Sequence, residues 1–352
     1  MSQLSATDEG LPDGPQADER LFSNETLDLG PYEVEESAEG FLGEGAYGSV
    51  FKGRSKATGE WQVAVKKTPN AKLKPEELQL MKELSSDFLV ALLHFHTAEE
   101  FTYVVMELCD VDLARHFERL PEGSTGLGSR NFVRLLSDLS SAYTMLHRQH
   151  VVHRDIKPEN ILLIYGEESD IAADRPIKRC KLTDFGMCRS LAGAGAVDEA
   201  TQECSDYDYE APSDSDSDKG YDSPTGGRPS NVAGTPLYMA PEVAANLIST
   251  REYDSKVDMW SIGCVLYESL CRRAPFDERA LCKLFLVAAT SNFRAYKRPT
   301  LPDAVPWEVR ELVGRLLDVD AERRMDAGLF CSTANEYARQ FQDQGPHHSW
   351  AS

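Results

Sequence analysis

The sequence lacks several features that would point to a membrane or secreted protein. Its apolar runs stop well short of the roughly 18 residues that a membrane-spanning helix needs. The N-terminal segment carries acids where a secretory signal would carry a basic region and an apolar stretch, so we expect no such signal. The eight cysteines include no C-x-x-C pair and no His/Cys cluster typical of zinc. We therefore expect reduced thiols and a cytoplasmic or nuclear protein without a membrane span.

An excess of basic residues is also missing. The net charge is −21, and most of it comes from two segments. Residues 1–40 carry a net charge of −10 and residues 198–222 carry −9, which leaves the rest of the chain nearly neutral. Because both acidic segments would repel phosphates, we expect no nucleic acid partner.

The chain has 352 residues and 41% apolar content, enough for two lobes with a sizeable core. Residues 32–109 contain short β-like runs and one helical segment, 75–84. Residues 110–335 are mainly helical, with helices expected at 131–147, 258–270 and 307–317. The pattern predicts an α+β fold with a small, mostly-β lobe and a larger, mostly-α lobe. The remaining segments are predicted as a disordered acidic tail (1–31), a loop insertion (166–178), an acidic disordered insertion (191–230) and a C-terminal tail (336–352).

A glycine-rich turn, G-E-G-A-Y-G, begins at Gly43. Glycines let backbone N–H groups approach phosphate oxygens without a clash from Cβ. The same letters could open a dinucleotide-binding βαβ unit, but the residues that follow, 49–53, are strand-like and do not begin a helix. The residues of this turn and its flanks that we expect to contact a nucleotide are Leu42, Gly43, Gly45, Gly48 and Val50.

Lys66 ends the run V-A-V-K on a predicted strand, where Ala64 shares its face. Small Ala64 leaves room for a flat base, while the Lys66 amine can reach the α- and β-phosphates. Taken alone, Lys66 would be better explained as a surface lysine that ends a strand, but its distance from the glycine-rich turn favours the nucleotide role. We expect Glu77, on the helix of the small lobe, to hold this lysine in place, with Glu76 and Glu83 as rivals.

The segment after the last strand of the small lobe is predicted to be a hinge. Adenine needs one acceptor and one donor along a backbone edge, which the Glu107 carbonyl and the Cys109 amide could supply. Met106 precedes them in the nucleotide-binding set. Asp112 would lie near the ribose hydroxyls, although a helix cap is nearly as good an interpretation. Leu162 would form the floor beneath the adenine.

The segment H-R-D-I-K-P-E-N contains several groups suited to phosphoryl transfer. Asp155 would accept or orient the proton of an attacking hydroxyl, and Lys157 would counter charge on the transferred group. Asn160 and Asp184 supply the oxygen ligands that Mg²⁺ prefers. His153 is better explained as a packed core residue. Either aspartate alone could be a turn or cap residue, but the set together favours catalysis.

These motifs resemble those of the eukaryotic protein kinase family, over roughly residues 40–330. The matching strings are G-E-G-A-Y-G-S-V, V-A-V-K, H-R-D-I-K-P-E-N, D-F-G, G-T-P-L-Y-M-A-P-E and D-M-W-S-I-G, in that order. The resemblance implies a two-lobed fold with ATP and Mg²⁺ in the cleft between the lobes. It also implies that Glu242 pairs with Arg324 and that Asp258 supports the backbone of the catalytic loop.

The resemblance is to the Ser/Thr type, which implies protein substrates with Ser or Thr acceptors. Lys157 and the Gly234-Thr235 pair before Pro236 follow the Ser/Thr pattern, and Thr235 joins the catalytic candidates. Met187, large and apolar, leans toward serine acceptors. The alternative is a pseudokinase, a scaffold or regulatory binding protein on the same fold. The intact set of Lys66, Asp155, Asn160 and Asp184 disfavours that alternative. A small-molecule kinase is disfavoured by the A-P-E segment.

The chain departs from the family pattern in two insertions. Asn160 and Asp184 lie 24 positions apart, and Asp184 and Glu242 lie 58 apart, about double the common spacing. The acidic insertion could pair with Arg154 and activate, mimic an anionic substrate and inhibit, or form a solvated loop that carries phosphorylation sites. The last is our preferred interpretation. Candidates for further partners are an upstream kinase acting on 198–225 and a regulatory subunit.

One basic cluster has two interpretations. Arg175, Lys178, Arg179 and Lys181 could form a nuclear signal. We favour a solvated loop that runs into a strand.

Overall fold

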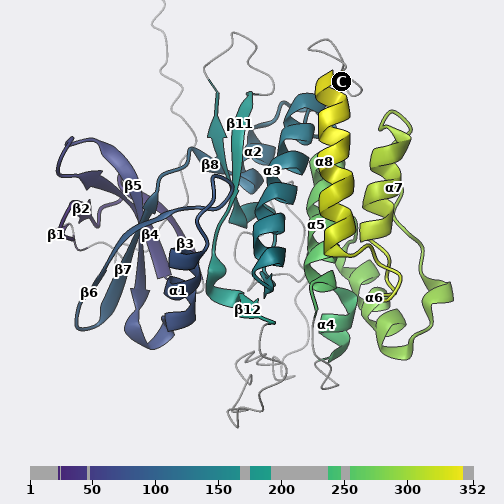
Figure 1. Cartoon of the computed structure of the whole chain (residues 1–352), viewed down its shortest axis with the longest axis horizontal. Helices are drawn as coiled ribbons and strands as arrows, with labels where there is room; N and C mark the ends of the chain where they lie inside the picture. The colour runs from purple at the N-terminus through teal and green to yellow at the C-terminus, as the bar shows by residue number, and fades with distance from the viewer. Residues whose placement is uncertain are drawn as a thin grey trace, which may run out of the picture.

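The fold is described from a computed structural model, which describes residues 23, 25–45, 48–166, 175–191, 237–246 and 254–343. Figure 1 shows a β-sheet on the left and a group of helices on the right, with β8 and β11 between them. The predicted α+β class with two lobes is confirmed. In the described part of the chain, no helix is both long and apolar enough to cross a membrane.

The small lobe is built on an antiparallel sheet of order β1-β2-β4-β5-β7-β6, with β3 paired to β4. Its strands are β1 (Thr26–Asp28), β2 (Tyr32–Glu35), β3 (Phe41–Gly45), β4 (Gly48–Ser55), β5 (Trp61–Pro69), β6 (Leu92–Thr97) and β7 (Phe101–Glu107). Side chains alternate along β5, so neighbouring residues face opposite sides of the sheet. Val63 and Val65 join a core that contains Phe51, Tyr103 and Val105. Residues 64 and 66 therefore face the opposite side of the sheet.

The α-helix described in the small lobe, α1 (Pro75–Glu83), follows the short 3₁₀ turn η2 (Asn70–Lys72). Pro75 occupies the first helical turn, where its missing N–H costs no hydrogen bond. Leu78 and Met81 are buried in the larger core, and Glu77 is buried beside them. The apolar positions thus fix which acid of α1 faces inward.

The large lobe is organised around α5 (Lys256–Cys271), in which every residue from 257 to 270 is buried. An all-round apolar helix of this kind needs neighbours on each side. The other helices of the lobe are α2 (Leu113–Arg119), α3 (Ser129–Arg148), α4 (Pro241–Asn246), α6 (Glu278–Thr290), α7 (Trp307–Leu316) and α8 (Ala327–Asp343), with the 3₁₀ turn η5 (Phe293–Ala295). Ser140 of α3 donates a hydrogen bond to the Asn335 side-chain oxygen of α8 at 3.0 Å.

Two small sheets position the segments that carry Asp155, Asn160 and Asp184. Strands β8 (Val111–Asp112), β10 (Ile161–Tyr165) and β11 (Ile177–Leu182) form one in the order β11-β10-β8, and β9 (Val151–Val152) pairs with β12 (Arg189–Ser190) in the other. The 3₁₀ turns η3 (Pro158–Asn160) and η4 (Phe185–Met187) lie between these strands. Residues 153–160 and 183–188 are therefore held at both ends.

The lobes are joined beside β11. The Val90 amide donates to the Leu182 carbonyl at 3.0 Å, and the Leu182 amide donates to the Phe88 carbonyl at 2.9 Å. Phe88 and Val90 follow α1 in the small lobe, whereas Leu182 lies two positions before Asp184. The position of the small lobe is thus linked to the segment that carries Asp184.

The structure corrects three predicted boundaries. The segment expected as a disordered tail contains β1, and Leu29 is 1% exposed in the core of the small lobe. The large lobe continues to Asp343 through α8, past the expected boundary at 335. Strand β11 begins at Ile177, inside the expected loop insertion. Residues 192–230 of the acidic insertion lie outside the described residues.

The pair between Glu242 of α4 and Arg324 is confirmed. Two guanidinium nitrogens donate to the two carboxylate oxygens at 2.6 and 2.9 Å, and the Arg324 side chain is fully buried. A bidentate pair fixes both groups in orientation as well as distance.

We predict that Arg324→Ala lowers the free energy of unfolding by about 3–5 kcal/mol, because it leaves the Glu242 carboxylate without its partner. The matched control is Arg310→Ala, which removes a pair with an Asp303 side chain that is 99% exposed. The control should cost at most about 1 kcal/mol. Denaturant titration of both variants measures the difference, and equal losses would contradict the prediction.

Candidate active site

Lys66 lies between two carboxylates from separate parts of the chain. Its amine donates to Glu77 Oε1 of α1 at 3.0 Å and to Asp184 Oδ1 at 3.2 Å. The Lys66 side chain is 13% exposed and that of Glu77 is 7% exposed. The predicted pairing with Glu77 is confirmed, while the rival Glu76 is exposed on the outer side of α1.

The charges of this cluster support one another. Burial by itself would lower the pKa of Lys66, but the carboxylates of Asp184 and Glu77 raise it above its ordinary value. Burial would likewise raise the pKa of Asp184, yet the Lys66 amine holds it below its ordinary value. Both groups are therefore charged at neutral pH.

Asp184 has a φ of 64°, in the left-handed region that non-glycine residues seldom occupy. Its neighbours hold this conformation. The Thr183 amide donates to the Asn160 carbonyl at 3.0 Å, and Phe185 is buried with its ring edge-on to His153 at 5.6 Å between centroids. The strained backbone directs the carboxylate toward Lys66, as the ion pair shows.

The Asp155 carboxylate is held by two side chains. Lys157 Nζ donates to Oδ2 at 2.9 Å, and the Asn160 amide nitrogen donates to the same oxygen at 2.8 Å. Burial would lower the pKa of Lys157, but the Asp155 carboxylate raises it. With Oδ2 occupied, Oδ1 is the oxygen suited to accept a proton from a hydroxyl.

Asp258 of α5 supports the backbone before Asp155, as the resemblance implied. Its oxygens accept from the amides of His153 and Arg154, each at 2.7 Å, and from the Tyr143 hydroxyl at 2.8 Å. Arg154 has a φ of 68°, so this carboxylate holds a turn that is otherwise unfavourable. Asp258 is fully buried, and burial raises its pKa.

His153 is a core residue, as predicted. Its ring is fully buried, and Nδ1 accepts from the Asp155 amide at 3.3 Å. Nε2 must then carry the proton, which it donates to the Thr183 carbonyl at 3.1 Å. This ring connects the segment that carries Asp155 to the one that carries Asp184.

Asn160 lies next to the segment that carries Asp184, because its carbonyl accepts from the Thr183 amide. The Asn160 amide nitrogen also donates to the Asp155 carbonyl at 2.8 Å, which leaves its side-chain oxygen as a neutral oxygen donor. Asp184 contributes a charged oxygen that is partly exposed. Hard oxygen donors of this kind suit Mg²⁺, so the residues fit the expected ion.

The predicted nucleotide-binding side chains share one face of the small sheet. Val50 is the register partner of Lys66, and Ala64 is the register partner of Met106. Directly opposite residues of antiparallel strands point to the same side. Gly48 has a φ of 144°, and a Cβ there would clash with the Lys67 carbonyl, so glycine is required.

The hinge and floor residues lie where β7 leads into the large lobe. Among the described residues, the Cys109 amide has no hydrogen-bond partner, which leaves it free to donate to a base. Leu162 of β10 is partly buried and pairs with Asp112 of β8. Asp112 caps α2 by accepting from the Arg115 amide at 2.8 Å, so the cap interpretation is confirmed.

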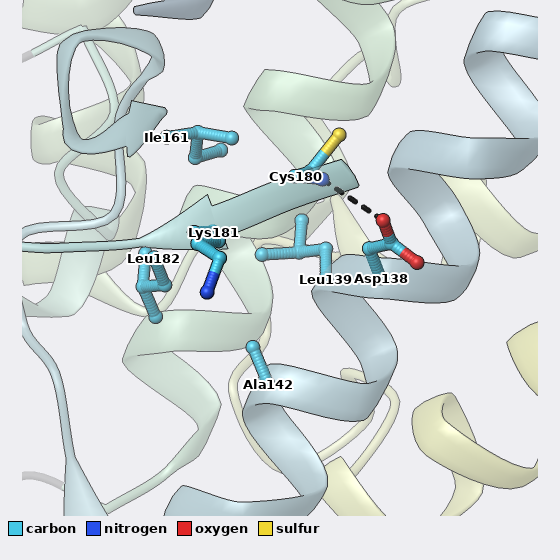
Figure 2. A pocket seen from close by; sticks show the side chains of 7 residues that line it. All are labelled: Asp138, Leu139, Ala142, Ile161, Cys180, Lys181 and Leu182. Carbon is cyan, nitrogen blue, oxygen red and sulfur yellow. Dashed lines mark hydrogen bonds between the residues drawn. The ribbon is translucent and has the colours of Figure 1, made fainter. Parts of the chain in front are cut away.

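Strand β11 is anchored by a contact that the sequence did not reveal. The Asp138 carboxylate of α3 accepts from the Cys180 amide at 2.9 Å (Figure 2). The Lys181 side chain projects to the other side of the strand from the Cys180 sulfur. Lys181 donates to the Glu107 carboxylate at 2.8 Å and is 9% exposed. The predicted run of the basic cluster into a strand is confirmed, but Lys181 is buried and not solvated, and it ties the strand before Asp184 to the hinge.

The remaining predicted site residues have mixed outcomes. Leu42, Gly43 and Gly45 lie on β3, as the glycine-rich turn requires. Thr235 lies outside the described residues. Sequence reasoning missed Lys181 and Arg115. The only signal for Arg115 was its i,i+3 spacing from Asp112, which indicates a helix start but no contact with another lobe.

Fold and site together define a two-lobed protein of the protein kinase type. The chain belongs to the protein kinase family, because the family described as protein kinase domain matches residues 37–225 and 214–334. The predicted resemblance to this family is thereby confirmed.

Several curated relatives carry the name serine/threonine-protein kinase. ULK1 of Homo sapiens is 31% identical over 313 residues, which are 87% of this chain and 25% of that protein. ULK3 of Xenopus laevis is 28% identical over 81% of this chain and 51% of that protein. ATG1 of Kluyveromyces lactis is 29% identical over 82% of this chain and 35% of that protein. The chain thus spans between a quarter and a half of the length of these relatives.

We predict that Glu77→Gln slows phosphoryl transfer by about 10- to 100-fold, because Lys66 then lacks the carboxylate that positions it from α1. Steady-state kinetics with a peptide acceptor measures the loss. The matched control, Glu76→Gln, changes the neighbouring exposed acid of the same helix and should leave the rate unchanged. Similar rates for the two variants would contradict the assigned pairing.

We predict that the coupling free energy between Lys66 and Asp184 is constant from about pH 5 to pH 9. Because the pKa of Lys66 is raised, its contribution to stability is complete below pH 10.5, the ordinary value, and is lost only as the pH rises through its pKa in the folded protein. Because the pKa of Asp184 is lowered, its contribution to stability is complete above pH 3.8, the ordinary value, and is lost only as the pH falls through its pKa in the folded protein. A double-mutant cycle of Lys66→Met and Asp184→Asn, followed by free energy of unfolding, measures this coupling. A coupling that faded within that range would show that one shift has the wrong direction.

Proposed function

We propose that this protein is a Ser/Thr protein kinase that transfers the γ-phosphoryl group of ATP to protein substrates in the presence of Mg²⁺. The observation that carries the proposal is the convergence of Lys66, Asp155, Asn160 and Asp184, which come from three separate segments of the chain. Members of the family generally use ATP and Mg²⁺, and family membership implies protein substrates.

Each residue has one task in this proposal. The Lys66 amine binds phosphate oxygens of the nucleotide while Glu77 and Asp184 hold its position. Asn160 and Asp184 would hold Mg²⁺, which supplies positive charge to neutralise the phosphates. Asp155 accepts the proton of the attacking hydroxyl, and Lys157 stabilises negative charge on the transferred group.

The nucleotide would lie against the face of the sheet that carries Val50 and Ala64. The unpartnered Cys109 amide supports hydrogen bonding to adenine at the hinge. Burial and the Glu107 carboxylate raise the pKa of the Cys109 thiol to about 12, so this thiol stays protonated beside the base. The proposal is thus supported at both ends of the cleft, the phosphate end and the adenine end.

Serine or threonine acceptors are supported by Lys157 and by the names of the relatives. Lys157 contacts the Asp155 carboxylate directly, so a charge partner for the transferred group lies beside the base. The pseudokinase alternative would require a defect in the cluster around Lys66, and the pairing described above argues against one.

We further propose a cytoplasmic or nuclear setting. Seven cysteines fall in the described part of the chain, and all seven are free thiols. Burial raises the pKa of Cys180 and Cys264 well above the ordinary value, which suits unreactive, reduced thiols.

The test is transfer of labelled γ-phosphate from ATP with Mg²⁺ to degenerate peptides that contain one Ser, Thr or Tyr. We expect transfer to Ser and Thr peptides, and Asp155→Asn should slow it by about 10²- to 10⁴-fold. Nucleotide binding should survive in this variant, because Asp155 contacts the acceptor and not the phosphates. Equally poor transfer by both proteins, despite nucleotide binding, would favour the pseudokinase.

A further inference from the structure

Arg115 of α2, in the large lobe, reaches the small lobe with its side chain. Its Nη2 donates to the Leu42 carbonyl of β3 at 2.8 Å, although 73 positions separate the two residues. A Cβ built on Gly43 would lie 3.5 Å from the same nitrogen, so the guanidinium lies directly against this glycine. The large lobe therefore contacts the strand that leads into the glycine-rich turn.

The base of this side chain is fixed within the large lobe. The Asp112 carboxylate accepts from the Arg115 amide at 2.8 Å, and its other oxygen lies 3.4 Å from Arg115 Nε. Asp112 caps α2, and its side chain is only 16% exposed. The guanidinium thus extends from a rigid helix start, and only its far end contacts the small lobe.

We propose that Arg115 is a positioning residue that holds β3 over the nucleotide and slows nucleotide release. The inference rests on the proposed nucleotide site, since Leu42, Gly43 and Asp112 all belong to the predicted binding set. The link at Val90 and Leu182 joins the lobes beside β11, whereas Arg115 joins them at the strand that covers the cleft. Loss of the Arg115 link leaves the link at Val90 and Leu182 intact. The lobes then stay together, while β3 loses its contact with the large lobe and stays paired with β4.

The planar guanidinium is essential to this role. It presents several N–H donors in a fixed fork, so one group can meet the Leu42 carbonyl and the Asp112 carboxylate together. A lysine ammonium carries the same charge but is a single point on a flexible stem. Arg115→Lys should therefore behave more like a loss than like a conservative change.

The experiment follows release of a fluorescent ADP analogue after rapid mixing with excess ATP. Because the Arg115 side chain is 44% exposed, we expect a modest effect. Arg115→Ala should accelerate release by about 3- to 10-fold, with KM for ATP rising in proportion. The single-turnover rate at saturating ATP should stay close to that of the wild type, because Lys66 and Asp155 are untouched.

A second measurement identifies which end of the nucleotide is affected. The link acts at the base and ribose end, so the affinity for adenosine should fall by the same factor as the affinity for ATP. Competition against the fluorescent analogue measures both. A structural defect that displaced the phosphate-binding groups would weaken ATP and spare adenosine.

The matched control is Arg119→Ala, which removes an exposed arginine from the same helix, one turn further from the cleft. It should leave release and KM unchanged. Arg115→Met keeps the aliphatic stem and guards against a loss of folding, which thermal unfolding of each variant would reveal. Unchanged release in Arg115→Ala and Arg115→Met would overturn the inference, whereas a wild type that binds no nucleotide would overturn the proposed function itself.

Discussion

The site depends on one ammonium group held between two carboxylates. Lys66 belongs to the sheet, Glu77 to α1, and Asp184 to the turn after β11, so a single cation fixes three elements relative to one another. Any one of these charges without its partners would destabilise the folded protein, because burial disfavours an isolated charge. In contact, Lys66 and Asp184 stay ionised, as the raised pKa of Lys66 and the lowered pKa of Asp184 indicate. The same contacts therefore position the Lys66 amine and hold α1 against the segment that carries Asp184.

Buried carboxylates elsewhere in the large lobe hold the backbone by accepting hydrogen bonds from its amides. Asp258 accepts from two consecutive amides before Asp155, and Asp138 accepts from the amide of Cys180 in β11. Burial raises the pKa of both acids, and the hydrogen bonds from the backbone offset that cost. A helix side chain that binds backbone N–H groups can hold a turn that has no regular partner strand. In this way the helices α5 and α3 determine where the catalytic segments lie.

The two lobes meet through contacts of different character. Beside β11 the link is made by backbone hydrogen bonds and by the buried ion pair of Lys181 with Glu107. At β3 the link is the half-exposed side chain of Arg115. Buried backbone contacts resist opening, while an exposed arginine exchanges readily with water. The molecule thus combines a firm joint at the hinge with a weaker one at β3.

The sequence by itself determined the fold class, the order of the elements and the chemical groups of the site, because periodicity and short motifs are local properties. It predicted the helix that carries Glu77, and helical spacing was enough to prefer that acid over its rivals. Only the tertiary structure decided that Leu29 lies in the core, that α8 continues to Asp343, and that Lys181 is buried and paired. Nor could the sequence show Arg115 meeting Leu42. Such contacts join residues far apart in the chain, and their geometry is set by how the lobes pack rather than by any neighbouring residue.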